Sequence, residues 1–158
     1  MDVLVWSSAV SRARAQAHGF GVASDQGALF ARGDVVSVHL RLVPQTRGVI
    51  GREDLLLMKA DATFINTSRA GLVAPGALVE ALRAGRPGAA AVDVFEREPM
   101  LDAADPLLAM DNVICTPHIG YVTREEFEIQ FAEIFDQILA YAAGSPINVV
   151  NADVLERR

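Results

Sequence analysis

The sequence predicts an α/β fold in which helices cover both faces of a parallel sheet. Apolar runs of strand length alternate with amphipathic runs of helix length along the 158 residues. This alternation is typical of successive β–α–β units. Several apolar runs, such as Val35–Leu40 and Ala89–Val94, are continuous rather than alternating. Continuous apolar strands indicate burial on both faces, which only a helix-covered parallel sheet provides.

Each element has a local signal of its own. We expect strands at Val3–Trp6, Gly21–Ala23, Val35–Leu40, Thr63–Asn66, Ala89–Val94 and Val113–Thr116. We expect helices at Ala9–Ala17, Gln26–Ala31, Glu53–Met58, Ala77–Arg83 and Glu125–Ala142. Gly85 and Pro87 end the fourth helix, because glycine is favoured just after a helix and proline cannot continue one.

The last helix has the clearest signals. Thr123 and Glu126 have the spacing of a capping box at its start. Its apolar side chains recur at helical spacing, so we expect a buried stripe on one side. The stripe consists of Phe127, Phe131, Ile134, Phe135, Ile138 and Leu139.

Composition excludes several functions. The net charge is −6 and the arginines are scattered, which argues against a nucleic-acid surface. Cys115 is the single cysteine, so we expect no internal disulfide and no thiol zinc site, as is usual in a reducing cytoplasm. No apolar run approaches the roughly 20 residues of a membrane helix. We therefore expect a soluble, cytoplasmic protein without a metal site.

Three residues that follow predicted strands suggest chemistry. Arg69, Glu98 and His118 lie in the segments INTSRAG (65–71), AVDVFEREP (91–99) and NVICTPHIG (112–120). The carboxyl ends of parallel strands face one crevice, where such sheets bind ligands. Arginine offers a planar charged fork for a carboxylate, and an imidazole can act as acid or base. A carboxylate can orient that imidazole, so the three groups could bind an anion and move a proton.

Other assignments remain open at this point. Glu96 is the rival of Glu98 if the loop is displaced. His39 is expected to be a packed or rim histidine rather than a catalytic one. The segment from Gly19 to Ser24 imitates a G-x-G-x-x-G phosphate loop, but it leads into a strand and its third glycine is replaced by Ser24. We therefore expect a simple turn between helix and strand there.

At these three segments the sequence resembles the D-isomer-specific 2-hydroxyacid dehydrogenases. The resemblance continues through residues 34–51, 55–69 and 144–151 and thus covers nearly the whole chain. It implies a doubly wound, Rossmann-type nucleotide-binding lobe that lacks the first strand and its glycine-rich turn. We expect this partial dinucleotide-binding domain over residues 1–151, including the helix at 123–143, and a C-terminal tail over 152–158.

The resemblance also implies roles for individual residues. Arg69 would bind the substrate carboxylate, Glu98 would pair with the imidazole, and His118 would be the general acid/base. The cofactor-binding residues would be Thr67 and Asp93 at the nicotinamide carboxamide, Gly120 beside the nicotinamide, Leu40 and Arg41 along the adenosine half, and Ser7 at the adenosine ribose. The cofactor would be NAD, with NADP not excluded, because Ser7 is not the acid that usually selects NAD.

The implied function is hydride transfer between a nicotinamide cofactor and a small 2-hydroxy or 2-oxo acid. The full-length form is expected to be a homodimer. Two alternatives stay open: a cofactor-sensing module similar to the C-terminal binding protein corepressors, and an inactive, truncated fragment. In the strand order 3-2-1-4-5-6, loss of the first strand leaves the first two strands here without their inner neighbour. The isolated chain is therefore expected to bind cofactor poorly and to be inactive.

Overall fold

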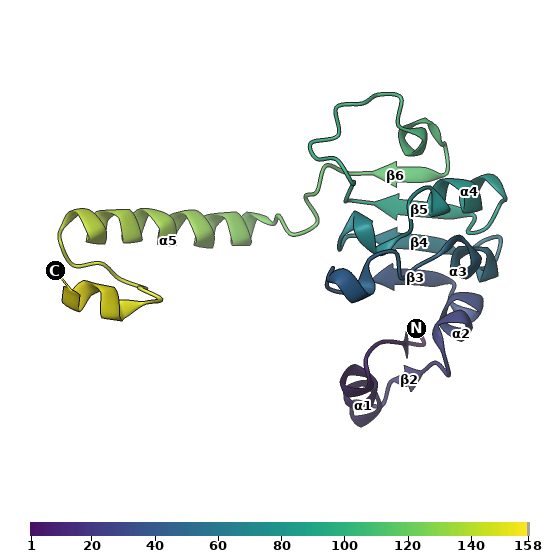
Figure 1. Ribbon diagram of the computed structural model, residues 1–158, viewed down its shortest axis with the longest axis horizontal. Coiled ribbons are helices and arrows are strands. Elements are labelled where there is room, and N and C mark those ends of the chain that lie inside the picture. Colours follow the sequence, from purple (N-terminus) through teal and green to yellow (C-terminus); the bar gives the residue numbers. More distant parts are fainter. Residues whose placement is uncertain (158) are drawn as a thin grey trace. The chain divides into compact units, whose positions relative to one another are not determined.

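A computed structural model describes residues 1–157 of the chain. The chain divides into two compact units, Met1–Gly120 and Tyr121–Arg158, which are drawn together in Figure 1. Each unit is described separately. Within residues 1–157, no helix combines the length and apolar character that a membrane crossing requires.

The centre of the first unit is a four-stranded parallel sheet in the order β3-β4-β5-β6. Its strands are β3 (Val35–Val38), β4 (Thr63–Asn66), β5 (Ala89–Val92) and β6 (Val113–Cys115). The connections carry the helices α3 (Arg52–Leu57) and α4 (Ala77–Arg83) and the 3-10 turns η1 (Pro44–Thr46), η2 (Ala70–Leu72) and η3 (Pro106–Ala109). Because the four strands are parallel, their carboxyl ends lie along one edge of the sheet (Figure 1).

The hydrophobic core lies against this sheet. Phe64, Leu55, Met58 and Leu72 are completely buried, and Phe64 stacks on Phe30 with ring centroids 6.5 Å apart. Phe30 comes from α2 (Gln26–Arg32), the helix that precedes β3. The core therefore joins the helices and the sheet into one packed layer system.

The remaining strands of the unit form a separate parallel pair. β1 (Leu4–Val5) pairs with β2 (Gly21–Val22), and α1 (Ala9–Ala17) connects them. Among residues 1–157, no strand joins β1 to β3. This confirms the expectation that the first two strands lack their inner neighbour. The turn at Gly19, with a φ of +78°, links α1 to β2, so the imitation of a phosphate loop is indeed a helix-to-strand turn.

The second unit contains α5 (Arg124–Ala142) and the 3-10 helix η4 (Ala152–Arg157). The hydroxyl oxygen of Thr123 accepts the backbone N–H of Glu126 at 3.1 Å, which confirms the predicted cap. The expectation of a buried stripe is wrong within this chain. No residue of α5 is buried, and the six stripe residues are 42% to 68% exposed. A helix buries a face only against a second layer, and this unit offers only η4 and short loops.

The predicted helices begin and end within one residue of the observed ones, but several strands are shorter than predicted. Val35–Leu40 pairs only to Val38, and Ala89–Val94 pairs only to Val92. Val38 and Val92 both pair with Asn66, the last residue of β4. The pairing of β3 and β5 with β4 therefore ends at these residues. Val94 is nevertheless buried. An apolar run therefore reports burial and not strand pairing.

Candidate active site

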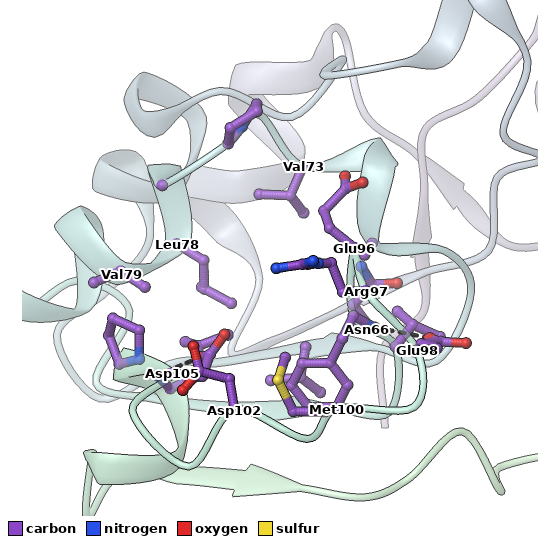
Figure 2. A pocket seen from close by; sticks show the side chains of 18 of the residues that line it. Asn66, Val73, Leu78, Val79, Glu96, Arg97, Glu98, Met100, Asp102 and Asp105 are labelled. Atoms are coloured by element: carbon purple, nitrogen blue, oxygen red, sulfur yellow. Dashed lines mark hydrogen bonds between the residues drawn. The ribbon is translucent and has the colours of Figure 1, made fainter.

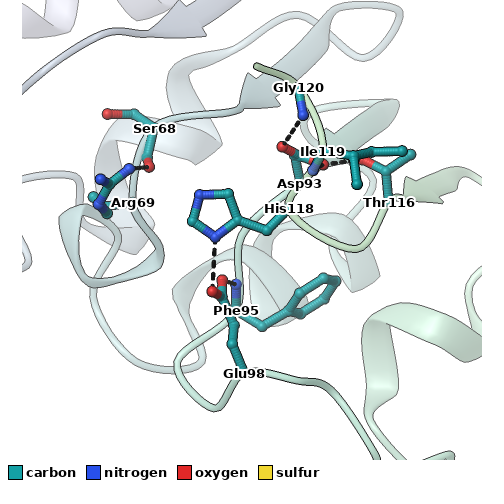
Figure 3. A network of polar contacts seen from close by, with 9 residues as sticks. All are labelled: Ser68, Arg69, Asp93, Phe95, Glu98, Thr116, His118, Ile119 and Gly120. Atoms are coloured by element: carbon teal, nitrogen blue, oxygen red, sulfur yellow. Dashed lines mark hydrogen bonds and ion pairs between the residues drawn. The ribbon is translucent and has the colours of Figure 1, made fainter. Parts of the chain in front are cut away.

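The candidate site lies in the loops that follow β4, β5 and β6. These loops contain the segments Asn66–Arg69, Asp93–Glu98 and Thr116–Gly120. Figure 3 shows that side chains from all three loops point toward one another around His118. The expectation that the strand ends bring these segments together is therefore met.

Glu98 and His118 form an ion pair at the centre of the site. Nδ1 of His118 lies 2.7 Å from Oε2 of Glu98, and Oε1 of the same carboxylate accepts the backbone N–H of Phe95 at 2.9 Å (Figure 3). The hydrogen bond from His118, then that from Phe95, and the positive charges of His118 and Arg69 hold the pKa of Glu98 below its ordinary value, against a smaller effect of burial. Glu98 is therefore a carboxylate that orients the imidazole.

Arg69 lines the same small pocket, about 260 Å³ in volume, as Glu98 and His118. Its backbone is held by Asn66, which is 1% exposed. Nδ2 of Asn66 donates to the carbonyl oxygen of Arg69 at 3.1 Å, and Oδ1 accepts the backbone N–H of Ser68 at 3.0 Å. The guanidinium donates to the carbonyl oxygen of Ser68 at 2.6 Å and is exposed. A charged fork thus lies at the rim of the pocket that contains the imidazole.

Asp93 lies directly behind His118. Its Oδ1 accepts the hydroxyl of Thr116 and the backbone N–H of Ile119, the latter at 2.9 Å, and its Oδ2 accepts the N–H of Gly120 at 2.7 Å. Burial raises the pKa of Asp93, but these three hydrogen bonds and the charge of His118 outweigh it, so the pKa is lowered. Asp93 is consequently a buried carboxylate.

Thr67, Asp93 and Gly120 lie together. A Cβ atom on Gly120 would lie 2.9 Å from Oδ2 of Asp93 and 3.6 Å from Cβ of Thr67. Thr67 is exposed beside them. Thr67 and Gly120 are thus two exposed residues that adjoin the buried carboxylate of Asp93.

The other predicted cofactor residues lie away from this cluster. The carbonyl oxygen of Leu40 accepts the hydroxyl of Ser68 at 2.7 Å, and Arg41 is exposed at the end of the same strand segment. Ser7 follows β1 and thus belongs to the separate strand pair. Its carbonyl oxygen accepts Nη1 of Arg12 at 2.6 Å. Ser7, Leu40 and Arg41 are not among the described residues that line the pocket of Arg69.

The sequence reasoning did not select three residues that support the site. Asn66 and Ser68 hold the Arg69 loop, and Thr116 donates to Asp93. A signal for Asn66 was present, because an asparagine at the end of a strand followed by small polar residues favours an Asx turn. Thr116 had only its position before Pro117 as a signal.

A larger cavity of about 1150 Å³ lies between α4 and the segment after β5 (Figure 2). Val73, Leu78 and Val79 face it from the α4 side, and Met100 faces it from the other side. It contains Glu98, but neither Arg69 nor His118. Val94, Phe95, Glu96 and Glu98 border both cavities, and His118 lines the smaller one.

The fold and the site together define a class of protein. A parallel sheet with an arginine, an imidazole and a carboxylate at its carboxyl edge is typical of a nucleotide-dependent enzyme domain. No glycine-rich turn leads from a strand into a helix within residues 1–157. The described residues also contain no cluster of three or more metal-ligating side chains that could hold a metal ion.

Comparison with known proteins gives the family. The model of the family described as "D-isomer specific 2-hydroxyacid dehydrogenase, NAD binding domain" matches residues 1–120. The chain therefore belongs to this family. It is 40% identical over 152 residues to D-3-phosphoglycerate dehydrogenase of Methanocaldococcus jannaschii, covering 96% of this chain and 29% of that protein. It is 43% identical over 131 residues to glyoxylate reductase of Aeropyrum pernix, covering 82% and 39%.

A solved structure has the same fold. The putative D-3-phosphoglycerate dehydrogenase of Ralstonia solanacearum is 52% identical, with a TM-score of 0.87 over 98% of this chain and 45% of that protein. The fold is thus a Rossmann-type dehydrogenase fold, and the matched region is the NAD-binding domain of the family. The chain spans less than half the length of these relatives.

Proposed function

We propose that this chain forms the nucleotide-binding side of an active site that transfers hydride between a nicotinamide cofactor and a 2-oxo or 2-hydroxy acid. The observation that carries the proposal is the His118–Glu98 pair, 2.7 Å apart, in one pocket with the exposed guanidinium of Arg69. The family suggests the reaction class. The site offers a group that could bind an anion and a group that could transfer a proton, both at the carboxyl edge of the sheet.

Arg69 would bind the substrate carboxylate. A guanidinium and a carboxylate form charge-assisted, bidentate hydrogen bonds that fix the orientation of the bound acid. Asn66 and Ser68 hold the backbone of this loop, so the guanidinium starts from a fixed base. The carbonyl carbon of the acid would then lie between Arg69 and the imidazole.

His118 would move the proton. Nδ1 of His118 bonds to Glu98, and we assign the proton transfer to Nε2, which would donate to the carbonyl oxygen in reduction and accept from the hydroxyl in oxidation. Bound nicotinamide would supply or accept the hydride. Negative charge develops on the oxygen only in the transition state, where the imidazolium and the guanidinium stabilise it most. The carboxylate of Glu98 keeps the imidazole oriented throughout.

The proposed partners follow from the family. The relatives are named for phosphoglycerate and glyoxylate, and a small 2-oxo or 2-hydroxy acid is the class these substrates share. We propose NAD as the cofactor, with NADP open because Ser7 carries no charge to repel a 2′-phosphate. We further propose a cytoplasmic homodimer in the longer form of the protein.

Ligand-dependent melting tests the proposal. NADH at millimolar concentration should raise the melting temperature of the 158-residue chain, and glyoxylate should raise it further, since a ligand that binds only the native state stabilises it. Arg69→Gln should abolish the glyoxylate increment and keep the NADH increment. Arg69→Lys retains the charge and should keep part of the glyoxylate increment. An undiminished glyoxylate increment in Arg69→Gln would contradict the assigned role.

Turnover by the same polypeptide is a separate measurement. No glycine-rich turn for the pyrophosphate is present among the described residues, so loss of NADH absorbance with glyoxylate should stay at the background rate. Fast reduction by the purified chain would show that this turn is dispensable.

A further inference from the structure

We propose that Asp93 is a positioning residue, which closes the Thr116–Gly120 loop around His118 and thereby places the imidazole against Glu98. This inference deepens the proposed function, on which it rests for the role of the imidazole. The observation behind it is that one buried carboxylate accepts hydrogen bonds from both sides of His118 in the sequence.

The hydrogen bonds enclose the histidine. The Thr116 hydroxyl precedes His118 by two residues, and the N–H groups of Ile119 and Gly120 follow it directly (Figure 3). All three donate to the same carboxylate. The loop can therefore move away from Asp93 only if three hydrogen bonds to a charged acceptor break together, and hydrogen bonds to charged groups are stronger than neutral ones.

The loop needs such a restraint because the backbone of His118 is unusual. Its φ is +58°, in the left-handed region that residues other than glycine seldom occupy. A residue stays in this strained conformation only when contacts with its surroundings hold it there. The N–H of His118 bonds to the carbonyl oxygen of Thr116 at 3.0 Å, which is one local contact. Three further hydrogen bonds, from Thr116, Ile119 and Gly120, bracket the turn and end on Asp93.

Asp93 is itself fixed to the sheet. It is 3% exposed, it follows β5 directly, and its N–H donates to the carbonyl oxygen of Asn66 at 3.0 Å. The N–H of Thr116 donates to the carbonyl oxygen of Val92 at 3.0 Å. The sheet thus holds both ends of the arrangement, so the position of the carboxylate determines that of the loop.

Gly120 makes the contact possible. A Cβ there would lie 2.9 Å from Oδ2 of Asp93, closer than real Cβ contacts allow. The φ of Gly120 is not in the left-handed region. The restriction to glycine therefore comes from the close approach of Asp93 and not from backbone conformation.

The pKa of Glu98 provides a readout that a general loss of stability would not move. In the wild type, the hydrogen bond from His118 is the first cause of its lowered pKa, followed by the bond from Phe95, with Arg69 as a further cation. Asp93→Asn keeps the shape but removes the negative charge. Its NH2 group cannot accept the N–H of Gly120, so at most two of the three hydrogen bonds, now to a neutral acceptor, can remain. If Asp93 positions the imidazole, the pKa of Glu98 should rise toward its ordinary value in this variant.

The sign of this change is diagnostic. Removal of the negative charge of Asp93 would by itself lower the pKa of a neighbouring carboxyl group, so a rise must come from displacement of His118. The pKa is measured by a carbon-detected NMR titration of the Glu98 carboxyl group in the whole chain. Amide exchange of Ile119 and Gly120 should accelerate at least tenfold in the same variant.

Asp54→Asn is the matched control. Oδ2 of Asp54 accepts the N–H of Gly51 at 2.8 Å, so this change also removes a carboxylate from a backbone donor, but in another loop. It should leave the pKa of Glu98 and the exchange of Ile119 and Gly120 unchanged. A folded Asp93→Asn with an unchanged Glu98 pKa would overturn the proposal.

Gentler variants keep the test decisive if Asp93→Asn does not fold. Thr116→Val removes one donor without altering charge and should raise the Glu98 pKa by a smaller amount, while Thr116→Ser should restore it. Gly120→Ala should act in the same direction through the close contact. An unchanged Glu98 pKa in folded Thr116→Val and Gly120→Ala would equally overturn the proposal. None of these measurements uses a substrate, so they remain valid if glyoxylate or NADH fails to bind.

Discussion

The four-stranded sheet and the two-stranded pair of the first unit are both parallel, but they differ in what surrounds them. The side chains of Phe64, Leu55 and Met58 are fully buried against the larger sheet. In the pair, Leu4, Val5 and Val22 are only half-buried. A strand pair without a third strand or a full helix layer is marginally stable. The difference shows that strands gain their stability from neighbours and not from their own composition.

The same difference divides the candidate site. Arg69, Glu98 and His118 all follow strands of the larger sheet, whereas Ser7 follows the pair. The proposed proton-transfer and anion-binding groups therefore have a rigid base. The residue proposed for the adenosine ribose has a weaker one.

The largest effect is expected from the core of the larger sheet. Phe64→Ala should lower the free energy of unfolding by about 3–5 kcal/mol, because it removes a buried ring and leaves a cavity. Val5→Ala in β1 should lower it by less than about 1 kcal/mol. Urea unfolding monitored by circular dichroism measures both. Similar losses in the two variants would mean that the pair is as firmly packed as the sheet.

Native-state hydrogen exchange should show the difference without a mutation. The N–H groups of Gly21 and Ala23 bond across the pair, and those of Asp93 and Thr116 bond across the larger sheet. The amides of Gly21 and Ala23 should exchange through local opening. The free energy of this opening should be at least about 2 kcal/mol lower than that for the amides of Asp93 and Thr116. Equal protection of all four amides would contradict the contrast.

Acid sensitivity should be localised in the larger sheet region. The folded pKa of Glu98 is lowered, so this group adds stability above its unfolded pKa, and that stability is lost as the pH falls through the folded pKa. Near pH 6, the melting temperature of the wild-type protein should be higher than that of Glu98→Gln. The difference between the two melting temperatures should become smaller in the acid range. Glu96→Gln serves as the control and should show no such narrowing. Parallel curves for wild type and Glu98→Gln would refute the expected linkage.

The smallest effect is expected in the second unit. Phe135 lies on α5 with its side chain mostly exposed, so Phe135→Gln should change the free energy of unfolding of the first unit by no more than about 0.5 kcal/mol. The measurement is the same urea titration, followed by the resonances of Phe64 and Leu55. A loss approaching that of Phe64→Ala would place Phe135 among the core residues.

Much of this architecture could be predicted from the sequence, because its signals are local. Helix boundaries followed from caps such as Thr123, and the parallel sheet followed from continuous apolar strands. The loops of Arg69, Glu98 and His118 were placed by strand ends alone. The family resemblance suggested their roles, which remain proposals, as does the single domain over residues 1–151.

The remaining features depend on contacts between distant segments. The apolar stripe on α5 has helical spacing, and the ring centroids of Phe127 and Phe131 lie 4.3 Å apart. The spacing of residues in the sequence, however, does not show whether a second layer of structure covers the stripe. The bonds from Thr116, Ile119 and Gly120 to Asp93 join residues more than twenty positions apart. No periodicity in the sequence encodes them.

The order of strands in the larger sheet also bears on how the site forms. β4, β5 and β6 are adjacent in the sheet and consecutive in the sequence, so their pairings all lie within one contiguous stretch of the chain. During synthesis, the pocket of Arg69, Glu98 and His118 can therefore assemble once Gly120 has left the ribosome, while α5 is still inside the exit tunnel. The site thus belongs to one contiguous stretch of the chain, which is synthesised without interruption and can fold as a unit.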